Sequence, residues 1–407
     1  MTTETRPNES TPLLGLRKAS LRGSQFNIAV KRKIKQIPFV RRMLADRYLM
    51  RKYDMIMSAS FQPTLYSEER NLSISEIEIN KNCNLNCVMC NTALSQRAQK
   101  NMDFALFEKV LKHAKDLGQR IVSLHTIGEP LMNPHLEEYF RMVRAHGLKI
   151  FLSTNCLLLE KRMETLVAYA DIIQTFRLSI DGATKETYEK IRRPAKFDVL
   201  LKNLNYLKEI TEERRCFSDI RINSIVSRDV QHELGFHIKF YSKYVDIRNI
   251  ELNLVSGLSP DNTYFLNESI LKNHIVPWHP CDQLFSSTLH VLNDGRTTAC
   301  CRDYNGDLVY GNIRDGDPKD LINNDEVLEL RKQHLENRIP RGSLCASCFR
   351  IDPRVAELFR LFVYGLIDRF ANNWEVERMQ SRFDDLFSEF SHGIPTVNSF
   401  LRLFRDK

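Results

Sequence analysis

The ten cysteines of this 407-residue chain gather in two groups, which is the residue pattern most able to do chemistry here. The first group, on one short segment, consists of Cys83, Cys87 and Cys90. The second, spread over a longer segment, consists of Cys281, Cys300, Cys301, Cys345 and Cys348, while Cys156 and Cys216 stand alone. No stretch has the ~20 apolar residues of a membrane span and no apolar signal run opens the chain, so we expect a cytoplasmic protein. Reducing conditions there oppose disulfides and favour metal ligation.

The first group has the spacing Cys-x3-Cys-x2-Cys. Three thiolates on a tight loop can bind three irons of a [4Fe–4S] cube and leave the fourth iron open to a ligand that is not protein. An open iron indicates chemistry, because a purely structural cluster has four protein ligands. The alternative at this stage is a zinc site that lacks its fourth ligand.

The second group ends in a close Cys345-x2-Cys348 pair, with Cys281 and Cys300 further upstream. Four such cysteines suit a zinc ribbon as well as an iron–sulfur cluster, so the spacing leaves both readings open. Either Cys300 or its neighbour Cys301 can be the second ligand, and we favour Cys300. The thiol left over could give a hydrogen atom to a substrate radical.

The segment around the first group alternates strand patterns with helical periodicity. Strands are predicted over residues 75–80, 121–126, 149–154, 174–180, 219–227 and 249–255, and helices between them over, for example, 104–117, 135–146 and 202–212. This alternation predicts an α/β fold, a partial (β/α)6 TIM-like barrel, whose functional groups lie at the carboxyl ends of the strands. Cys83, Cys87 and Cys90 follow directly after the first predicted strand.

Motifs at the ends of further strands make the segment resemble the radical S-adenosylmethionine (radical SAM) superfamily. Gly128-Glu129-Pro130 follows the second strand, and Ser153-Thr154-Asn155 follows the third, with Cys156 where that family usually has glycine. Ser179-Ile180-Asp181-Gly182 ends the fourth strand, and Ile191-Arg192-Arg193 comes soon after. The resemblance covers roughly residues 75–255.

The resemblance implies that S-adenosylmethionine chelates the open iron and is cleaved to a 5′-deoxyadenosyl radical by an electron from an external flavodoxin- or ferredoxin-type donor. Glu129, between Gly128 and Pro130, is then expected to pair with the amine of the methionine moiety, and Arg192 with its carboxylate. Further expected cofactor contacts are Ser153, Asn155 and Ser179 at the strand ends and Met89 against the adenine.

The second cysteine group resembles SPASM/twitch domains, which carry auxiliary clusters. That resemblance implies a second [4Fe–4S] cluster on Cys281, Cys300, Cys345 and Cys348, and leaves Cys301 as the candidate hydrogen donor. Four domains are therefore expected: a basic tail and arm (residues 1–70), the radical SAM core (71–256), the SPASM/twitch-like domain (257–350) and a helical C-terminal extension (351–407).

The N-terminal arm carries the net charge of +8, because residues 1–70 hold 14 Lys+Arg against 6 Asp+Glu and the remainder is balanced. After Pro38 the pattern of Val40, Leu44 and Tyr48 between arginines predicts a basic amphipathic helix. Such a helix can bind an anionic membrane surface or RNA, or can simply pack on the barrel. A peripheral membrane location is thus one expectation.

Three functions compete. The first is hydrogen abstraction from a sugar, aminocyclitol or related polyol, followed by oxidation or epimerisation with the help of the single auxiliary cluster. The second is a maturase that modifies a peptide or protein, which the lack of a strand pattern in residues 1–70 disfavours. The third is an enzyme for a lipid-linked or RNA substrate recruited by the basic arm.

Overall fold

The computed structural model describes residues 38–256, 263–300, 302–370 and 375–403. The chain divides into two units, residues 1–51 and 52–407. Helix α2 (Pro38–Ser58) begins at the predicted proline, which is tolerated in a first helical turn because that N–H has no helical partner. Most of the predicted arm lies outside the described residues, so its binding to lipid or RNA, and the location of the protein, stay predictions. None of the described helices is both long and apolar enough to cross a bilayer.

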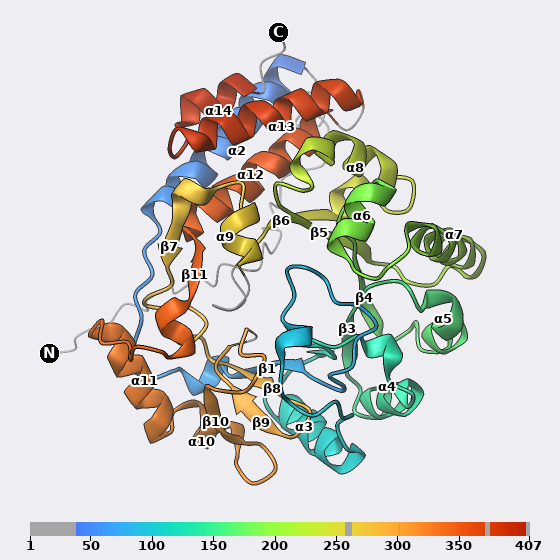
Figure 1. Ribbon diagram of the computed structural model, residues 1–407, viewed down its shortest axis with the longest axis vertical. Coiled ribbons are helices and arrows are strands. Elements are labelled where there is room, and N and C mark those ends of the chain that lie inside the picture. The colour runs from blue at the N-terminus through green and yellow to red at the C-terminus, as the bar shows by residue number, and fades with distance from the viewer. Residues whose placement is uncertain (1–37, 257–262, 301, 371–374, 404–407) are drawn as a thin grey trace, which may run out of the picture. The chain divides into compact units, whose positions relative to one another are not determined.

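The described residues contain a nine-stranded sheet in the order β10-β9-β8-β1-β2-β3-β4-β5-β6. Six consecutive strands at one end of this order are parallel, as predicted: β1 (Ser73–Ile77), β2 (Ile121–Ser123), β3 (Lys149–Thr154), β4 (Ile173–Ser179), β5 (Ile220–Val226) and β6 (Ile250–Leu254). The sheet curves into an arc with helices along its outer side (Figure 1). This is the expected α/β architecture of a partial barrel.

The helices that cover the outer side follow the strands in turn: α3 (Phe104–Asp116), α4 (Leu136–Ala145), α5 (Leu159–Ala168), α6 (Lys185–Ile191), α7 (Phe197–Arg214) and α8 (Leu234–Tyr241). Alternation along each strand decides which side is apolar. In β3, for example, Ile150 and Leu152 are fully buried towards the helices, whereas Phe151 and Ser153 face the concave side and are only partly buried. The concave side is therefore the one open to ligands.

The cysteine-rich segment adds strands to the same sheet. Strand β8 (Thr288–Val291) pairs in parallel with β1, and β9 (Arg296–Thr298) and β10 (Val309–Asn312) continue antiparallel. A separate two-stranded sheet joins β7 (Ile275–Pro277) to β11 (Phe349–Ile351). Short helices α9 (Tyr264–Glu268), α10 (Pro318–Ile322) and α11 (Asp325–Leu335) complete the segment.

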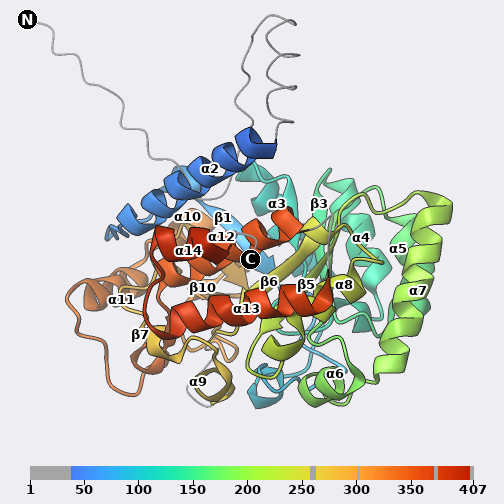
Figure 2. The same cartoon turned by 90° about the horizontal axis from the view of Figure 1, so that it is seen from above.

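The C-terminal stretch is helical, as predicted, with α12 (Pro353–Phe370), α13 (Val376–Ser391) and α14 (Val397–Leu403). The predicted apolar stripe of α12 is core, because each of its members is at most 1% exposed: Leu358, Phe359, Phe362, Val363, Leu366 and Ile367. Helix α13 packs on α8, where a Cβ on Gly235 would meet the Val376 carbonyl oxygen at 2.6 Å, so only glycine allows this approach (Figure 2).

Candidate iron–sulfur and cofactor site

The loop that carries the first cysteine group is held by backbone hydrogen bonds from two sides. On one side the Asn86 N–H donates to the Arg193 carbonyl at 2.6 Å, and the Val88 N–H donates to the Ile191 carbonyl at 3.0 Å. On the other side the Glu129 N–H donates to the Asn82 carbonyl at 2.8 Å. The loop is thus fixed against the ends of α6 and β2, at the carboxyl edge of the sheet where the sequence predicted it.

Gly128 and Glu129 lie against residues 80–82, which lead into this loop. A Cβ on Gly128 would lie 2.2 Å from the Asn80 carbonyl oxygen, so the position requires glycine. Glu129 is 3% exposed, and its carboxylate accepts hydrogen bonds from Thr154 Oγ1 at 2.7 Å, the Asn155 N–H at 2.7 Å and the Leu131 N–H at 3.1 Å. Burial raises its pKa despite these donors. The carboxylate therefore ties the end of β3 to the Gly128–Pro130 turn.

The ends of β3 and β4 bring further predicted residues together. Ser153 Oγ and Ser179 Oγ lie 3.2 Å apart, and Asn155 Nδ2 donates to Asn84 Oδ1 at 2.8 Å beside Cys83. Cys156 has φ of 71°, a left-handed conformation that glycine adopts more readily than a residue with a Cβ.

Arg192 is buried against Asp181, whose Oδ2 accepts from Arg192 Nε at 2.8 Å and Nη2 at 2.7 Å. Burial alone would lower the pKa of Arg192, but Asp181 and the neighbouring Cys87 thiol raise it, so the guanidinium stays charged beside the first cysteine group. Asp181 also accepts the Ile225 N–H at 2.6 Å. The sequence motifs include Asp181 and Thr154 but predict no role for either. Both are polar residues next to predicted site residues in the chain, and this proximity is the signal that could have identified them.

The residues present fit a cluster at the first group. Cys83, Cys87 and Cys90 are all free and partly buried, and their thiols interact electrostatically. Burial raises the pKa of Cys83 to about 12 and that of Cys87 to about 11, so thiolates at these two positions need a cationic partner such as iron. Met89 lies partly buried in the Cys87–Cys90 turn, and Pro130 is buried at the start of the 3-10 helix Pro130–Met132.

The second group is also assembled. The described thiols Cys281, Cys300, Cys345 and Cys348 are partly buried. Burial raises the pKa of the Cys345 thiol to about 12, and Cys281 and Cys348 lie close enough to interact with it electrostatically. Cys300, Cys281 and Cys345 all interact electrostatically with Tyr310. The four sulfurs thus share one neighbourhood, which fits a second cluster. Cys301, the expected hydrogen donor, lies outside the described residues.

No group of three or more His, Cys, Asp or Glu within the described chain lies close enough to hold a single metal ion. A cube of four irons separates its thiolates more widely than one ion does.

Comparisons with known proteins give two family matches. The profile of the radical SAM superfamily matches residues 77–219, and that of an iron-sulfur cluster-binding domain, SPASM, matches residues 281–349. The chain is 23% identical to the S-adenosyl-L-methionine-dependent 2-deoxy-scyllo-inosamine dehydrogenase of Niallia circulans over 70% of this chain and 96% of that protein. It is 26% identical to a probable GTP 3′,8-cyclase of Pyrococcus abyssi over 54% of this chain and 67% of that protein.

Among solved structures, Streptococcus suis SuiB bound to its precursor peptide SuiA superposes with a TM-score of 0.51 at 15% identity, covering 87% of this chain and 80% of that one. This likeness concerns the fold. Together with the two profile matches and the cysteine loop at the sheet edge, it defines the class: an S-adenosylmethionine-dependent iron–sulfur protein. The chain belongs to the radical SAM superfamily and carries a SPASM domain. Its cofactors are a [4Fe–4S] cluster with S-adenosylmethionine and auxiliary iron–sulfur.

Proposed function

We propose that the protein is a dehydrogenase that oxidises a secondary alcohol of a sugar-like or aminocyclitol substrate to a ketone. The observation that carries the proposal is a polar, charged wall on the concave side of the sheet. The wall consists of residues that alternate with buried apolar ones: Glu76 on β1, Arg177 on β4, Asn223 on β5, and Glu251 and Asn253 on β6. Bulky branched side chains usually fill a closed barrel, so these charges are unusual there.

Four of the five residues of the wall form one connected network. Arg177 Nε lies 3.4 Å from Glu251 Oε2, and Arg177 also donates to Asn223 Oδ1. Asn253 Nδ2 donates to the same Asn223 oxygen at 2.7 Å. The Arg177 guanidinium lies 5.8 Å from the centroid of the Phe151 ring, which adds an apolar surface. Donors, acceptors and one aromatic face are what a hydroxyl-rich ring needs for binding.

Charge on the wall is maintained at neutral pH. Burial opposes ionisation of Glu76, but a hydrogen bond from His290 and the nearby His125 and Arg177 outweigh it and lower the pKa of Glu76. Glu76 thus provides a carboxylate for an amino group, and Arg177 provides donors for hydroxyls. Because Arg177 lies two residues before Ser179 on the same face of β4, the wall begins directly below the strand ends.

The chain's own residues have defined parts in this proposal. Cys83, Cys87 and Cys90 hold the first cluster, and Cys281, Cys300, Cys345 and Cys348 hold the second. When bound, these groups and S-adenosylmethionine supply a hydrogen-abstracting radical and a one-electron acceptor. The cofactor-binding residues proposed are Met89, Gly128, Glu129, Pro130, Ser153, Asn155, Ser179 and Arg192, with Glu129 and Asp181 also fixing the elements around them. An alcohol that loses one hydrogen atom, one electron and one proton becomes a ketone.

The similarity to the Niallia circulans dehydrogenase supports this reading, because it extends over nearly all of that protein. The fold likeness to SuiB supports the alternative, in which the protein modifies a peptide. A likeness of fold alone does not identify a substrate.

The test uses anaerobically reconstituted protein, an aminocyclitol deuterated at its carbinol carbons, and a flavodoxin with its reductase. We expect deuterium in 5′-deoxyadenosine and one ketone for each 5′-deoxyadenosine formed. Arg177→Met should raise KM at least about tenfold, because one hydrogen bond between the substrate and a charged group is lost. Arg248→Met should leave KM unchanged, because Arg248 forms only an exposed ion pair with Asp246. Loss of deuterium from the carbinol without formation of a ketone would instead identify an epimerase. The proposal would be refuted if the protein left such alcohols unchanged but cleaved S-adenosylmethionine in a reaction coupled to a peptide.

A further inference from the structure

Arg97 connects the two cysteine-bearing halves of residues 52–407, the radical SAM half with the first cysteine group and the SPASM half with the second. It lies in the segment that follows Cys90, and its side chain is 5% exposed. Nη1 donates to Glu78 Oε1 at 2.9 Å and Nη2 to Glu78 Oε2 at 2.6 Å, a bidentate pair with a carboxylate that is fully buried. Such a paired fork gives fixed geometry as well as attraction.

The same guanidinium reaches the SPASM half. Nε donates to the Tyr304 carbonyl at 2.8 Å, and Nη1 donates to Asn293 Oδ1 at 3.1 Å. One side chain therefore connects the end of β1, the turn after β8 and the loop that follows Cys300. A lysine could not make these four bonds, since it has no planar fork.

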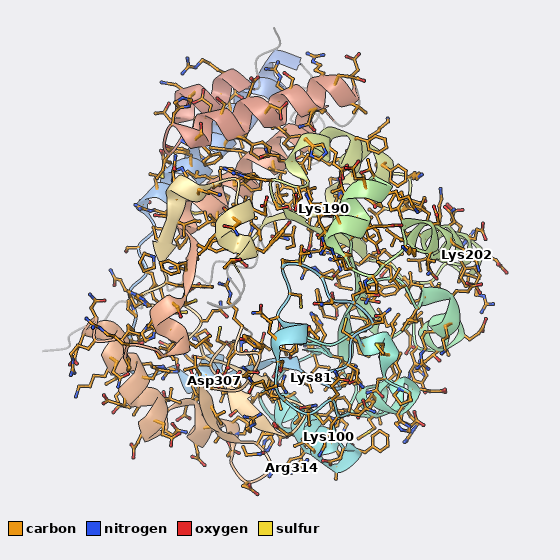
Figure 3. The ribbon with its side chains drawn as sticks, viewed as in Figure 1. Lys81, Lys100, Lys190, Lys202, Asp307 and Arg314 are labelled. Atoms are coloured by element: carbon orange, nitrogen blue, oxygen red, sulfur yellow. The ribbon has the colours of Figure 1, made fainter. Side chains whose placement is uncertain are left out.

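Neighbouring bonds run between the same two segments. Ser95 Oγ donates to the Tyr304 carbonyl at 2.9 Å, and the Gln96 N–H donates to Asn305 Oδ1 at 3.0 Å. Asn293 Nδ2 donates to the Lys100 carbonyl at 2.7 Å. Figure 3 labels Lys100, Lys81 and Asp307 in the region where these segments meet.

The loop on the SPASM side is ordered around Asp303. Its carboxylate accepts the N–H groups of Gly306 at 2.9 Å, Asp307 at 2.7 Å and Leu308 at 2.8 Å. The loop of residues 302–308 is thus folded on itself, and Arg97 and Ser95 hold it by the Tyr304 carbonyl. Since Arg302 N–H also donates to Cys300 Sγ at 3.3 Å, a shift of this loop moves an auxiliary thiol.

We propose that Arg97 is a positioning residue that holds the auxiliary-cluster loop against the first-cluster loop and so sets the separation of the two thiolate groups. Electron transfer between redox centres slows steeply as their separation grows. The inference rests on the proposed role of the second group as an electron acceptor, but not on the identity of the alcohol. Substrate oxidation then depends on Arg97, although Arg97 lies in neither thiolate group.

A second arginine provides the matched control. Arg314 also links the SPASM half to the core, by an ion pair with Asp103 at the start of α3, but its side chain is 41% exposed and that of Asp103 50%. Exposed pairs contribute little to stability, so Arg314→Lys should change nothing measured below. Arg97→Lys keeps the charge and removes the fork.

The first readout needs neither cofactor nor substrate. In hydrogen–deuterium exchange of the apoprotein, Arg97→Lys should speed exchange of the 302–308 amides at least about tenfold, as expected for loss of hydrogen bonds to a charged group. Ser95→Ala, which removes a single bond to Tyr304, should give a smaller change in the same direction. It keeps the test usable if Arg97→Lys fails to fold.

The second readout uses protein with both clusters reduced, in which magnetic interaction between the clusters is followed by electron paramagnetic resonance. Arg97→Lys, or Ser95→Ala to a lesser extent, should weaken that interaction at unchanged iron content, and Arg314→Lys should not. Unchanged exchange and unchanged magnetic interaction in Arg97→Lys would overturn the proposal. Because neither readout contains an alcohol, failure of the dehydrogenase assignment leaves both results readable.

Discussion

The two cysteine groups are built in different ways. The first lies on one loop of eight residues, 83–90, which backbone hydrogen bonds hold against the ends of α6 and β2. The second draws its cysteines from segments up to 67 residues apart in the chain, from 281 to 348. Charged side chains hold those segments: the fully buried Arg331 donates to the Leu284 carbonyl at 2.9 Å and to Ser67 Oγ at 2.6 Å, near Cys281.

The difference has a physical consequence. A loop fixed by main-chain bonds tolerates most side-chain changes, because those bonds do not depend on residue type. A site assembled by buried guanidinium groups depends on a few side chains, and removal of one leaves buried polar partners unsatisfied. We therefore expect the second group to be the more sensitive to mutation outside its cysteines.

The largest effect should come from the first group itself. Replacing Cys83, Cys87 and Cys90 together by Ala should lower iron content from about eight to about four per chain and abolish cleavage of S-adenosylmethionine, because one complete set of thiolates is lost. Iron analysis and chromatography of 5′-deoxyadenosine measure both. Residual cleavage in the triple variant would show that the open iron lies elsewhere.

Cys300→Ala should remove only the second cluster. Iron should fall to about four while cleavage of S-adenosylmethionine continues, since the first loop shares none of its backbone bonds with Cys300. Coupled ketone formation should stop. Should iron stay near eight, the ligand is not Cys300, and Cys301→Ala then decides whether its neighbour takes that place.

Glu129→Gln should weaken S-adenosylmethionine binding roughly ten- to a hundredfold at unchanged iron content, the loss of a charge-assisted bond. In the native protein the Glu129 carboxylate accepts hydrogen bonds from the Thr154 hydroxyl and the Asn155 N–H. In the variant one of these two groups would face an amide N–H2 in place of a carboxylate oxygen. Calorimetric titration measures the affinity. The exposed Glu137→Gln serves as the control, and equal affinity in both variants would contradict a role for Glu129.

The smallest effect concerns Cys156, whose φ of 71° strains a residue with a Cβ. Cys156→Gly should be about 1 kcal/mol more stable than Cys156→Ala in urea unfolding, because only glycine adopts this conformation without strain. At Cys216, which has no positive φ, the order should reverse. The same order at both positions would mean that backbone strain at Cys156 is negligible.

Much of the fold followed from sequence because its signals are local. The strand over 149–154 and the helix over 104–117 were predicted almost to the residue, since apolar periodicity and the Asp103 cap act within a few residues. The first cysteine loop and the Gly128–Pro130 turn are also features with local sequence signals. Their residue types and spacing, together with the resemblance to the radical SAM superfamily, identify them, because all their parts are close in the chain.

The sequence by itself therefore determined the barrel strands, the first cysteine loop and the superfamily. Only the tertiary structure decided that β8 joins β1 and extends the sheet, that Arg177 and Glu251 meet on the concave wall, and that Arg97 bridges to Tyr304. These contacts join residues 74 to 215 positions apart, and no local pattern encodes which distant partner a charged side chain meets. Strand order and burial make that choice, since they bring distant polar groups to one side of a sheet where each must find a partner.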